Sequence, residues 1–178
     1  MRLIPFLGML LLGGCITAST PEAGSWKIER SYDRIHGKPA GVAHVSARSR
    51  NERVRDLGLQ LGWLQLTCFE SAPVIRLEFN HRIGSNRTSV LSYRFDEHPG
   101  RDAKARFLAT YNIAVIEDPT EVAQFVDQLR ASTRLHVRVE SHVAGTTTVE
   151  FPVKGASAAI DVAFQSCSAE SAARPRSA

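Results

Sequence analysis

The residues best suited to chemistry in this 178-residue chain are its six histidines. His136 and His142 are six residues apart in a segment that alternates like a strand, so they would lie on one face about 20 Å apart, too far to share a metal ion. The other histidines have no cysteine or acidic residue at the spacing of a known metal site. They are His36, His44, His81 and His98. The sequence therefore predicts neither a metal site nor a cofactor.

The sequence also shows no motif of nucleophilic catalysis. Serines are frequent, but none lies in a Gly-x-Ser-x-Gly or Ser-x-x-Lys motif, and no nucleophile has a base beside it in the sequence. No glycine-rich phosphate loop occurs; Gly13 and Gly14 belong to an apolar leader. We therefore predict no catalytic residues and a protein that is not an enzyme. An enzyme whose carboxylates are brought together only by folding stays open as an alternative.

Tyr93-Arg94-Phe95-Asp96 places two opposite charges in an alternating segment. Arg94 and Asp96 would point to the solvent side of a strand while Tyr93 and Phe95 point inward. Two interpretations stay open. The pair contacts a partner protein, or it belongs to a cross-strand charge ladder worth under about 1 kcal/mol.

The first fourteen residues predict export. Arg2 precedes an apolar run at residues 3–12, which at about ten residues is too short to span a bilayer and is typical of a signal peptide. Leu12-Gly-Gly-Cys15 would end that signal.

The Cys15 ending resembles the lipobox of bacterial lipoproteins, although an ordinary signal peptide with a chance cysteine is the alternative. The resemblance implies that fatty acids such as palmitate are attached at Cys15, which becomes the first mature residue. Ile16 is not the aspartate that retains such proteins in the inner membrane, which favours the outer membrane. We expect a lipid-anchored, periplasm-facing envelope protein.

Cys68 and Cys167 are the two remaining cysteines. In an exported protein such a pair is typical of a disulfide. The bond would close a loop of about 99 residues, worth roughly 4–5 kcal/mol in the chain-entropy treatment. Two buried free thiols are the alternative.

The charge balance excludes one class of partner. The net charge of +4 is small, and the densest basic segment is interrupted by Glu52 and Asp56. That segment comprises Arg48, Arg50, Arg53 and Arg55. Nucleic-acid binding needs a basic stripe with interleaved aromatic residues, which is missing. We interpret residues 48–56 as a solvated loop with, at most, a loose contact to anionic lipid or glycan.

Alternating segments dominate the rest of the chain. Most of them have apolar residues at every second position, the pattern of antiparallel strands with one face in water. They are residues 26–34, 39–47, 59–69, 74–83, 88–96, 135–139 and 147–151. Turn-forming residues at 71–73, 84–86 and 144–145 predict hairpins.

Two segments have helical periodicity instead. The first begins with Asp118, Pro119 and Glu121, which together resemble a capping box. The second places Ile160 and Cys167 on one face. The sequence thus predicts an α+β fold, an antiparallel sheet or sandwich of about seven to nine strands with short helices at about 119–131 and 156–167. Residues 1–14 are the signal, 15–25 a tether, 26–167 one domain and 168–178 a disordered tail.

The order of these elements resembles a group of small exported bacterial domains that includes the TagO-like proteins associated with type VI secretion. The matching pieces are Trp26, Leu64-Gln-Leu-Thr-Cys68, Ile75-Arg-Leu-Glu-Phe79, Tyr93-Arg-Phe-Asp96, Phe125-Val-Asp-Gln-Leu129, Leu135-His-Val-Arg-Val139, Gly145-Thr-Thr-Thr-Val-Glu-Phe151 and residues 158–167. The resemblance implies a compact α+β envelope domain without catalytic residues. The basic segment 42–58 and the lipobox depart from the group, and no binding residue carries over.

The function expected from these observations is contact rather than catalysis. We expect a lipid-anchored envelope protein that contacts an envelope protein or the cell wall, in association with a secretion system. An inhibitor of a lysozyme-like hydrolase, using residues 48–56 as its plug, is the alternative. The membrane, through the anchor, is the other partner, and nucleic acid is not one.

Overall fold

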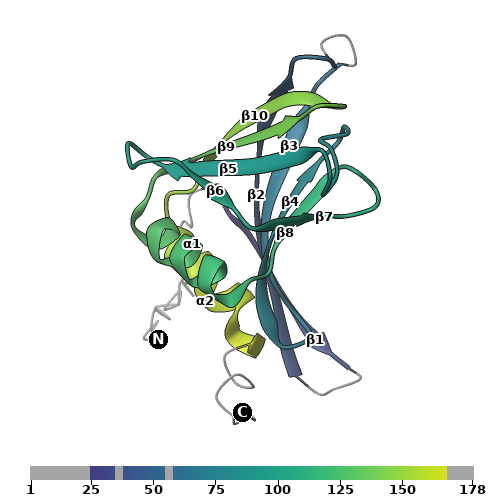
Figure 1. The fold of residues 1–178 in the computed structure, drawn as a ribbon. Coiled ribbons are helices and arrows are strands. Elements are labelled where there is room, and N and C mark those ends of the chain that lie inside the picture. The colour runs from purple at the N-terminus through teal and green to yellow at the C-terminus, as the bar shows by residue number, and fades with distance from the viewer. Residues whose placement is uncertain (1–24, 35–37, 55–57, 168–178) are drawn as a thin grey trace, which may run out of the picture.

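The computed structural model describes residues 25–34, 38–54 and 58–167. These residues form ten β-strands and two α-helices (Figure 1). The strands are β1 (Lys27–Asp33), β2 (Lys38–Asn51), β3 (Leu61–Phe69), β4 (Ala72–Phe79), β5 (Ser89–Phe95), β6 (Arg101–Ala103), β7 (Ala105–Phe107), β8 (Ile113–Ile116), β9 (Arg134–Ser141) and β10 (Gly145–Pro152). The helices are α1 (Pro119–Ala131) and α2 (Ala156–Ala163).

The sheet curls so that its two end strands are consecutive in the chain. The strands follow one another in the order β6-β5-β9-β10-β2-β3-β4-β8-β7, and every pairing is antiparallel. β6 and β7 stand at opposite ends of this order, yet only Lys104 separates them in the chain. The chain therefore closes the sheet into a nearly complete barrel (Figure 1).

The long strand β2 joins the two halves of the barrel. One edge pairs with β3, while the other pairs first with β1 and then, at residues 49–51, with β10. The buried Asn51 fixes this second junction, because its Nδ2 donates to the carbonyl oxygen of Ala144 at 3.0 Å and to Oγ1 of Thr147 at 2.6 Å. The N-terminal part of β2 therefore lies beside β1 and its C-terminal end lies beside β10.

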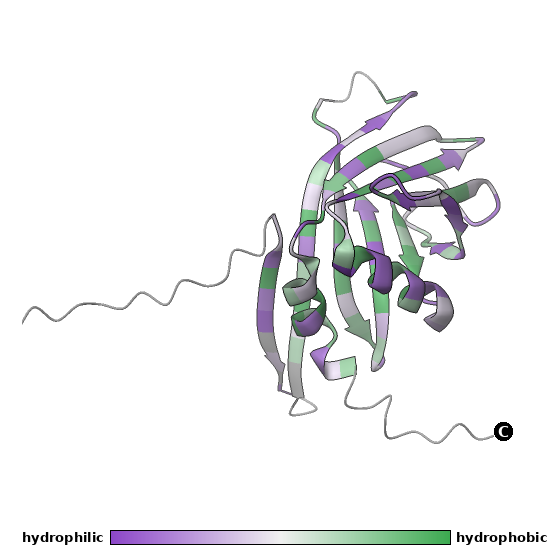
Figure 2. Ribbon diagram, turned by 90° about the vertical axis from the view of Figure 1, so that its left-hand side faces the viewer, coloured by the Kyte–Doolittle hydropathy of each residue, from purple (hydrophilic) through white to green (hydrophobic). Residues whose placement is uncertain are grey.

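The interior of the barrel is a packed core. Hydrophobic and hydrophilic residues alternate along the strands (Figure 2), and the inward side chains are almost entirely inaccessible to solvent. Tyr93, Phe95 and Phe125 form an edge-to-face cluster with ring centroids 5.0 to 5.7 Å apart, which links β5 to α1. Such pairs add to the free energy already gained by burying the rings.

Helix α1 begins as its sequence predicts. Asp118 is the N-cap, and its Oδ1 accepts hydrogen bonds from the backbone N–H groups of Thr120 and Glu121. These contacts satisfy two of the amide groups that a helix leaves open at its start. Phe125 and Leu129 are buried on the face toward the sheet.

Helix α2 lies directly on β2. Its buried residues include Ala159 and Ile160, and Gly41 of β2 lies beneath Val162. A Cβ atom at position 41 would lie 2.1 Å from the carbonyl oxygen of Val162. The close approach therefore requires glycine at this position.

Both ends of the domain are fastened. Cys68 of β3 and Cys167 are joined by a disulfide with their Cα atoms 5.7 Å apart, which confirms the predicted bond. At the other end, Nε1 of Trp26 donates to the carbonyl oxygen of Val153 at 3.1 Å, just before α2. The hydrogen bond holds the start of β1 near the start of α2, and the disulfide holds the residues after α2 against β3.

The predicted class is confirmed in its main terms, an antiparallel sheet with short helices. The predicted strand number is too low, and the strands form one sheet rather than a sandwich. The unpredicted strands are β6, β7 and β8. β6 and β7 are three residues each, and all four residues of β8 are buried, so none shows a clear alternation. The second helix ends at Ala163, and residues 165–167 form a separate helical turn.

Two predicted connections are also wrong. Residues 84–86 do not form a hairpin, because β4 pairs with β3 and β8 while β5 pairs with β6 and β9. Residues 48–51 do not form a loop. They are the last residues of β2, where Arg48 pairs with β3 and residues 49–51 pair with β10. Among the described residues, no helix is long and apolar enough to cross a membrane.

Candidate functional site

The outer face of β5, β9, β10 and β2, with β6 at one edge, forms a shallow hollow of about 830 Å³. Arginines dominate this face. We call it the basic hollow and define it by Arg48, Arg50, Ser92, Arg94, Asp102, His136, Arg138, Thr148 and Glu150. All nine come from strands, so the barrel holds their backbones in place.

One row of side chains crosses the hollow from β5 to β10. Arg94 lies opposite His136, which lies opposite Glu150. The imidazole Nδ1 of His136 is 3.3 Å from a carboxylate oxygen of Glu150, while its Nε2 is buried and has no hydrogen-bond partner in the described structure. The row therefore consists of a guanidinium, an imidazole and a carboxylate group, one on each of the three strands.

A second row runs parallel to the first and reaches β2. Ser92 lies opposite Arg138, then come Thr148 and Arg50. Neighbouring strands lie about 4.8 Å apart, so the backbones of Arg138 and Arg50 are separated by roughly 10 Å with Thr148 midway. At the β5 end, the Ser92 hydroxyl donates to Asp102 at 2.6 Å. Arg138 and Arg50 thus lie on either side of Thr148 in the strand register.

Most of the positive charge in the hollow is not used within the fold. Arg48, Arg50 and Arg94 form no ion pair with any described residue. Arg138 lies 3.1 Å from Glu140, but these side chains are 56% and 55% exposed. An exposed pair of this kind contributes about 0–1 kcal/mol, so Arg138 can turn to a ligand at little cost.

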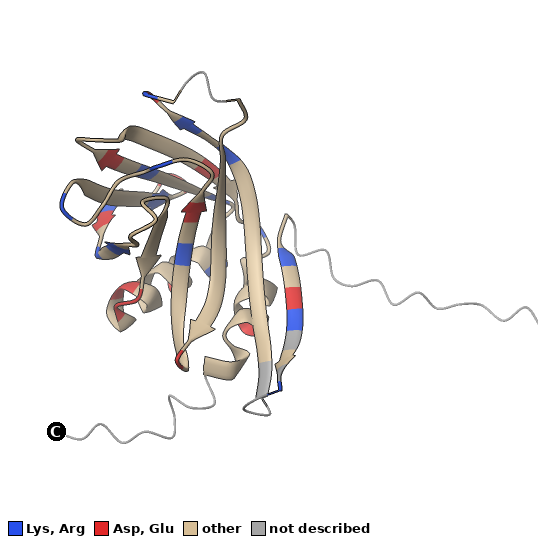
Figure 3. Cartoon of the chain, turned by 90° about the vertical axis from the view of Figure 1, so that its right-hand side faces the viewer, with Lys and Arg blue, Asp and Glu red and all other residues tan. Residues whose placement is uncertain are grey.

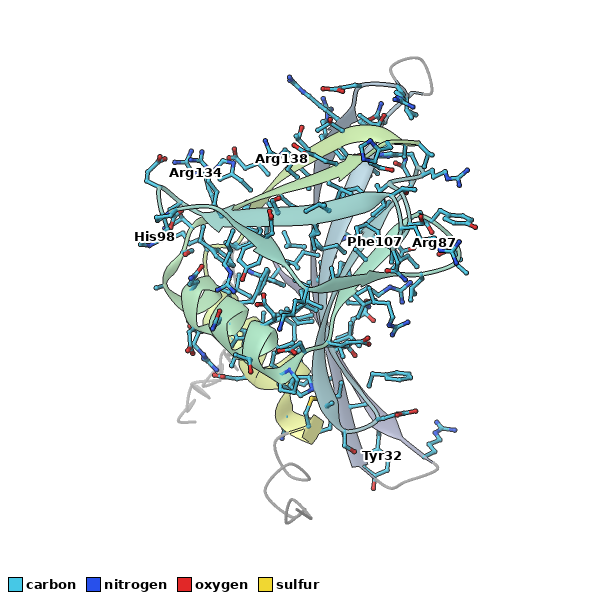
Figure 4. All side chains as sticks on the ribbon, in the orientation of Figure 1. Tyr32, Arg87, His98, Phe107, Arg134 and Arg138 are labelled. Atoms are coloured by element: carbon cyan, nitrogen blue, oxygen red, sulfur yellow. A yellow bond between two sulfur atoms is a disulfide. The ribbon has the colours of Figure 1, made fainter. Side chains whose placement is uncertain are left out.

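The arginines of β9 and of the C-terminal part of β2 lie on this outer surface. Arg134 and Arg138 project from β9 on the side away from the helices (Figure 4). On the right-hand side of the molecule, β2 and β3 show few charges along their lengths (Figure 3). β2 has no acidic or basic residue other than histidine between Pro39 and Ala47, and its arginines lie near its C-terminal end.

The two residues predicted for partner contact have separate positions. Arg94 is exposed in the basic hollow. Asp96 lies after β5 with a left-handed backbone at φ 43°, and its carboxylate accepts hydrogen bonds from the Thr133 hydroxyl and from the backbone amides of Thr133 and Arg134. These hydrogen bonds, led by that of the Thr133 hydroxyl, hold the pKa of Asp96 below its ordinary value. Asp96 therefore anchors the start of β9.

A partly buried ion pair joins β6 to α1. Arg101 Nη2 is 2.8 Å from Glu121 of α1, whose side chain is 10% exposed, and Arg101 also donates to Gln124. Tyr93 is beside this pair; burial raises the pKa of its hydroxyl, which has no hydrogen-bond partner in the described structure. The Glu121 side chain thus ties α1 to β6 through Arg101.

The remaining titratable groups do not assemble a second site. In the described parts of the chain, no three histidine, cysteine or acidic side chains are placed to hold a metal ion. Burial lowers the pKa of His81. The hydrogen bond between Arg106 and Glu117 raises the pKa of the arginine and lowers that of the glutamate.

Several sequence predictions lie outside the described residues. They concern the signal at residues 1–14, the lipidation of Cys15, the tether up to residue 24 and the tail at 168–178. These stay predictions.

The sequence reasoning missed the basic hollow as a unit. The sequence places Arg48 and Arg50 in an expected loop, considers His136 only as a metal ligand and considers Arg138 only as the polar side of a strand. One signal in the sequence was available. Arg48 and Arg50 are two residues apart, as are His136 and Arg138, and residues two apart in a strand lie on the same face. The pairing of β2 with β10 could not be read from that pattern.

Comparison with known proteins adds little. No family model matches the chain, and none of the curated proteins matches it. Among solved structures, the invasion-associated protein B of Bartonella henselae is similar with a TM-score of 0.49 and 14% identity, over 83% of this chain and 95% of that chain. Similarity at this level carries no inference about activity.

Proposed function

We propose that this chain is a non-catalytic, lipid-anchored envelope protein that works by binding a partner in its basic hollow. The observation that carries the proposal is the set of three arginines, Arg48, Arg50 and Arg94, held on rigid strands without an ion-pair partner among the described residues. Positive charge that the fold does not use favours an anionic partner.

The envelope location rests on the sequence, through the signal peptide and Cys15. The disulfide between Cys68 and Cys167 supports export only in a general way, since such bonds persist in oxidising compartments. The association with type VI secretion rests on the resemblance to the TagO-like group alone.

Site-specific photo-crosslinking in intact cells tests the proposal. A photoreactive residue replaces Thr148 between Arg138 and Arg50, or, as the control, Gln65 on the outer face of β3 away from the hollow. We expect a crosslinked adduct from position 148 and little or none from position 65. Replacing Arg48, Arg50 and Arg94 with glutamine in the position-148 protein should remove the adduct.

Two outcomes would contradict the proposal. The first is no adduct from position 148, and the second is equal adducts from both positions. A lysozyme inhibition assay with the same arginine variants distinguishes the hydrolase-inhibitor alternative, because inhibition that survives the three substitutions would place the inhibitory surface elsewhere.

A further inference from the structure

We propose that the ligand of the basic hollow is an acidic saccharide, a sugar chain whose rings carry carboxylate groups. The inference rests on the proposed function and adds the ligand class to it. Three features of the hollow carry it: the position of two arginines around a hydroxyl, the presence of carboxylates among the arginines, and the size of the hollow.

The arginines of the second row are placed to hold one anionic group. Arg138 and Arg50 lie on either side of Thr148 across the strands, roughly 10 Å apart at the backbone. Both side chains point to the same outer face and are exposed. A carboxylate above Thr148 could accept paired N–H bonds from a guanidinium on one or both sides and a bond from the hydroxyl below.

The carboxylates indicate that the ligand also has donor groups. Asp102 and Glu150 line the same hollow as the four arginines. Both carboxylates would repel the anionic groups of any ligand, those of a phosphatidylglycerol surface or a polyglutamate segment included, so anionic groups alone do not account for this lining. Sugar hydroxyls donate hydrogen bonds to carboxylates. The Thr148 hydroxyl can donate to or accept from the same sugar hydroxyls, and the Ser92 hydroxyl, which already donates to Asp102, can accept from them. The mixture of groups therefore favours a saccharide, whose rings carry hydroxyl groups beside their carboxylates.

The size of the hollow agrees with a short segment of sugar chain. Its volume of about 830 Å³ falls in the range of small-molecule clefts, about 300–1,000 Å³. It crosses four strands, or roughly 14 Å between the backbones of β5 and β2. Protein partners usually need a larger surface, about 800 Å² on each side.

The binding experiment uses the full mature lipoprotein in a neutral polyoxyethylene detergent. Four probes are compared: hexagalacturonate, neutral maltohexaose, a hexaglutamate peptide, and vesicles of phosphatidylglycerol. We expect hexagalacturonate to bind and the other three to bind at least tenfold more weakly. Binding should weaken as the salt concentration rises, because salt screens exposed charges.

Two pairs of variants report on the arginines. Replacing Arg50 and Arg138 together with glutamine should weaken hexagalacturonate binding at least tenfold. Replacing Arg87 and Lys154 with glutamine makes the same change of charge outside the hollow and should alter binding less than twofold. All four positions are exposed, and circular dichroism with a thermal melt checks that each variant is folded.

Removing the carboxylates separates the saccharide from other anions. Asp102→Ala with Glu150→Ala makes the hollow more positive, so a polyanion held by its charge alone, such as the hexaglutamate peptide, would bind more tightly. A saccharide loses two hydrogen-bond acceptors, so hexagalacturonate should bind more weakly. Tighter hexagalacturonate binding in this variant, or wild-type binding of the peptide or vesicles that equals that of hexagalacturonate, would overturn the inference. A protein adduct from position 148 in cells would overturn the ligand class while leaving the proposed function intact.

Discussion

Asp96 carries out a task that its sequence position did not reveal. Its carboxylate binds the Thr133 hydroxyl and the first amides of the β9 segment, 37 residues along the chain. Alternation in Tyr93-Arg94-Phe95-Asp96 correctly indicated which residues are buried and that Arg94 is exposed. It could not indicate that the Asp96 carboxylate binds the start of β9, because that contact depends on residues 37 and 38 positions further along the chain.

The pKa of Asp96 leads to a prediction for stability in acid. A carboxyl group whose pKa is lower in the folded than in the unfolded chain stabilises the fold above its ordinary pKa, near 3.8, and loses this effect as the pH falls toward the folded pKa. Asp96→Asn should therefore lower the urea midpoint at pH 7. The loss of stability of this variant between about pH 5 and pH 2 should be smaller than that of the wild type.

The remaining acid sensitivity of that variant has an identified source, because the pKa of Glu117 is also lowered. Asp102→Asn serves as the matched control, since Asp102 is exposed and is bonded only to Ser92 among the described residues. If Asp96→Asn lost as much stability in acid as the wild type does, the hydrogen bonds to Thr133 would not be the cause of the shifted pKa.

The helices and strands that could be predicted are those whose sequence pattern is visible within the segment itself. Helix α1 was located because Asp118 and Pro119 mark its start and its apolar residues repeat with helical period. The long strands were found because one face of each is exposed. β8 was missed because Ile113–Ile116 is buried on both faces and shows no alternation. The identity of β6 and β7 as strands depends on their partners, β5 and β8.

The contact between α2 and β2 predicts a specific sensitivity at Gly41. Gly41→Ala would put a Cβ atom 2.1 Å from the Val162 carbonyl oxygen, so the helix must shift away from the strand. We expect a loss of about 1–3 kcal/mol in unfolding free energy, the usual range for overpacking. Chemical denaturation monitored by circular dichroism measures it.

Gly100→Ala is the matched control for that substitution. A Cβ atom at position 100 would have its nearest neighbour, the carbonyl oxygen of Tyr93, at 3.7 Å, an ordinary contact. The control should change stability by less than about 0.5 kcal/mol. Equal stabilities of the two variants would mean that α2 adjusts to position 41 without cost.

At the scale of the whole molecule, the order of the strands was the least predictable feature. Short connectors suggest hairpins, and this held for β9 and β10, but the connection from β4 to β5 crosses between the two halves of the barrel. Closure through Lys104 and the pairing of β2 with β10 depend on residues far apart in the chain. The basic hollow assembles across these pairings, so its residues could be found singly but not as a group.

The disulfide acts on the whole molecule, because the loop between Cys68 and Cys167 contains every element from β4 to α2. A cross-link that closes a loop of this length restricts the unfolded chain strongly, by roughly 4–5 kcal/mol. Replacing both cysteines with alanine should therefore lower the melting temperature of the mature protein by about 8–15 °C. The fold itself should persist, since Leu64, Leu66 and Ile160 remain buried around the two positions.

Reduction with dithiothreitol should reproduce this decrease in the wild type and have no effect on the double variant. Thiol labelling of the unfolded, unreduced protein, with Cys15 replaced by alanine, gives the direct measurement. We expect no labelled cysteine before reduction and two after it. Two labelled cysteines before reduction would show that the bond does not form, and α2 would then be held to β2 by its packing against Gly41 and the core alone.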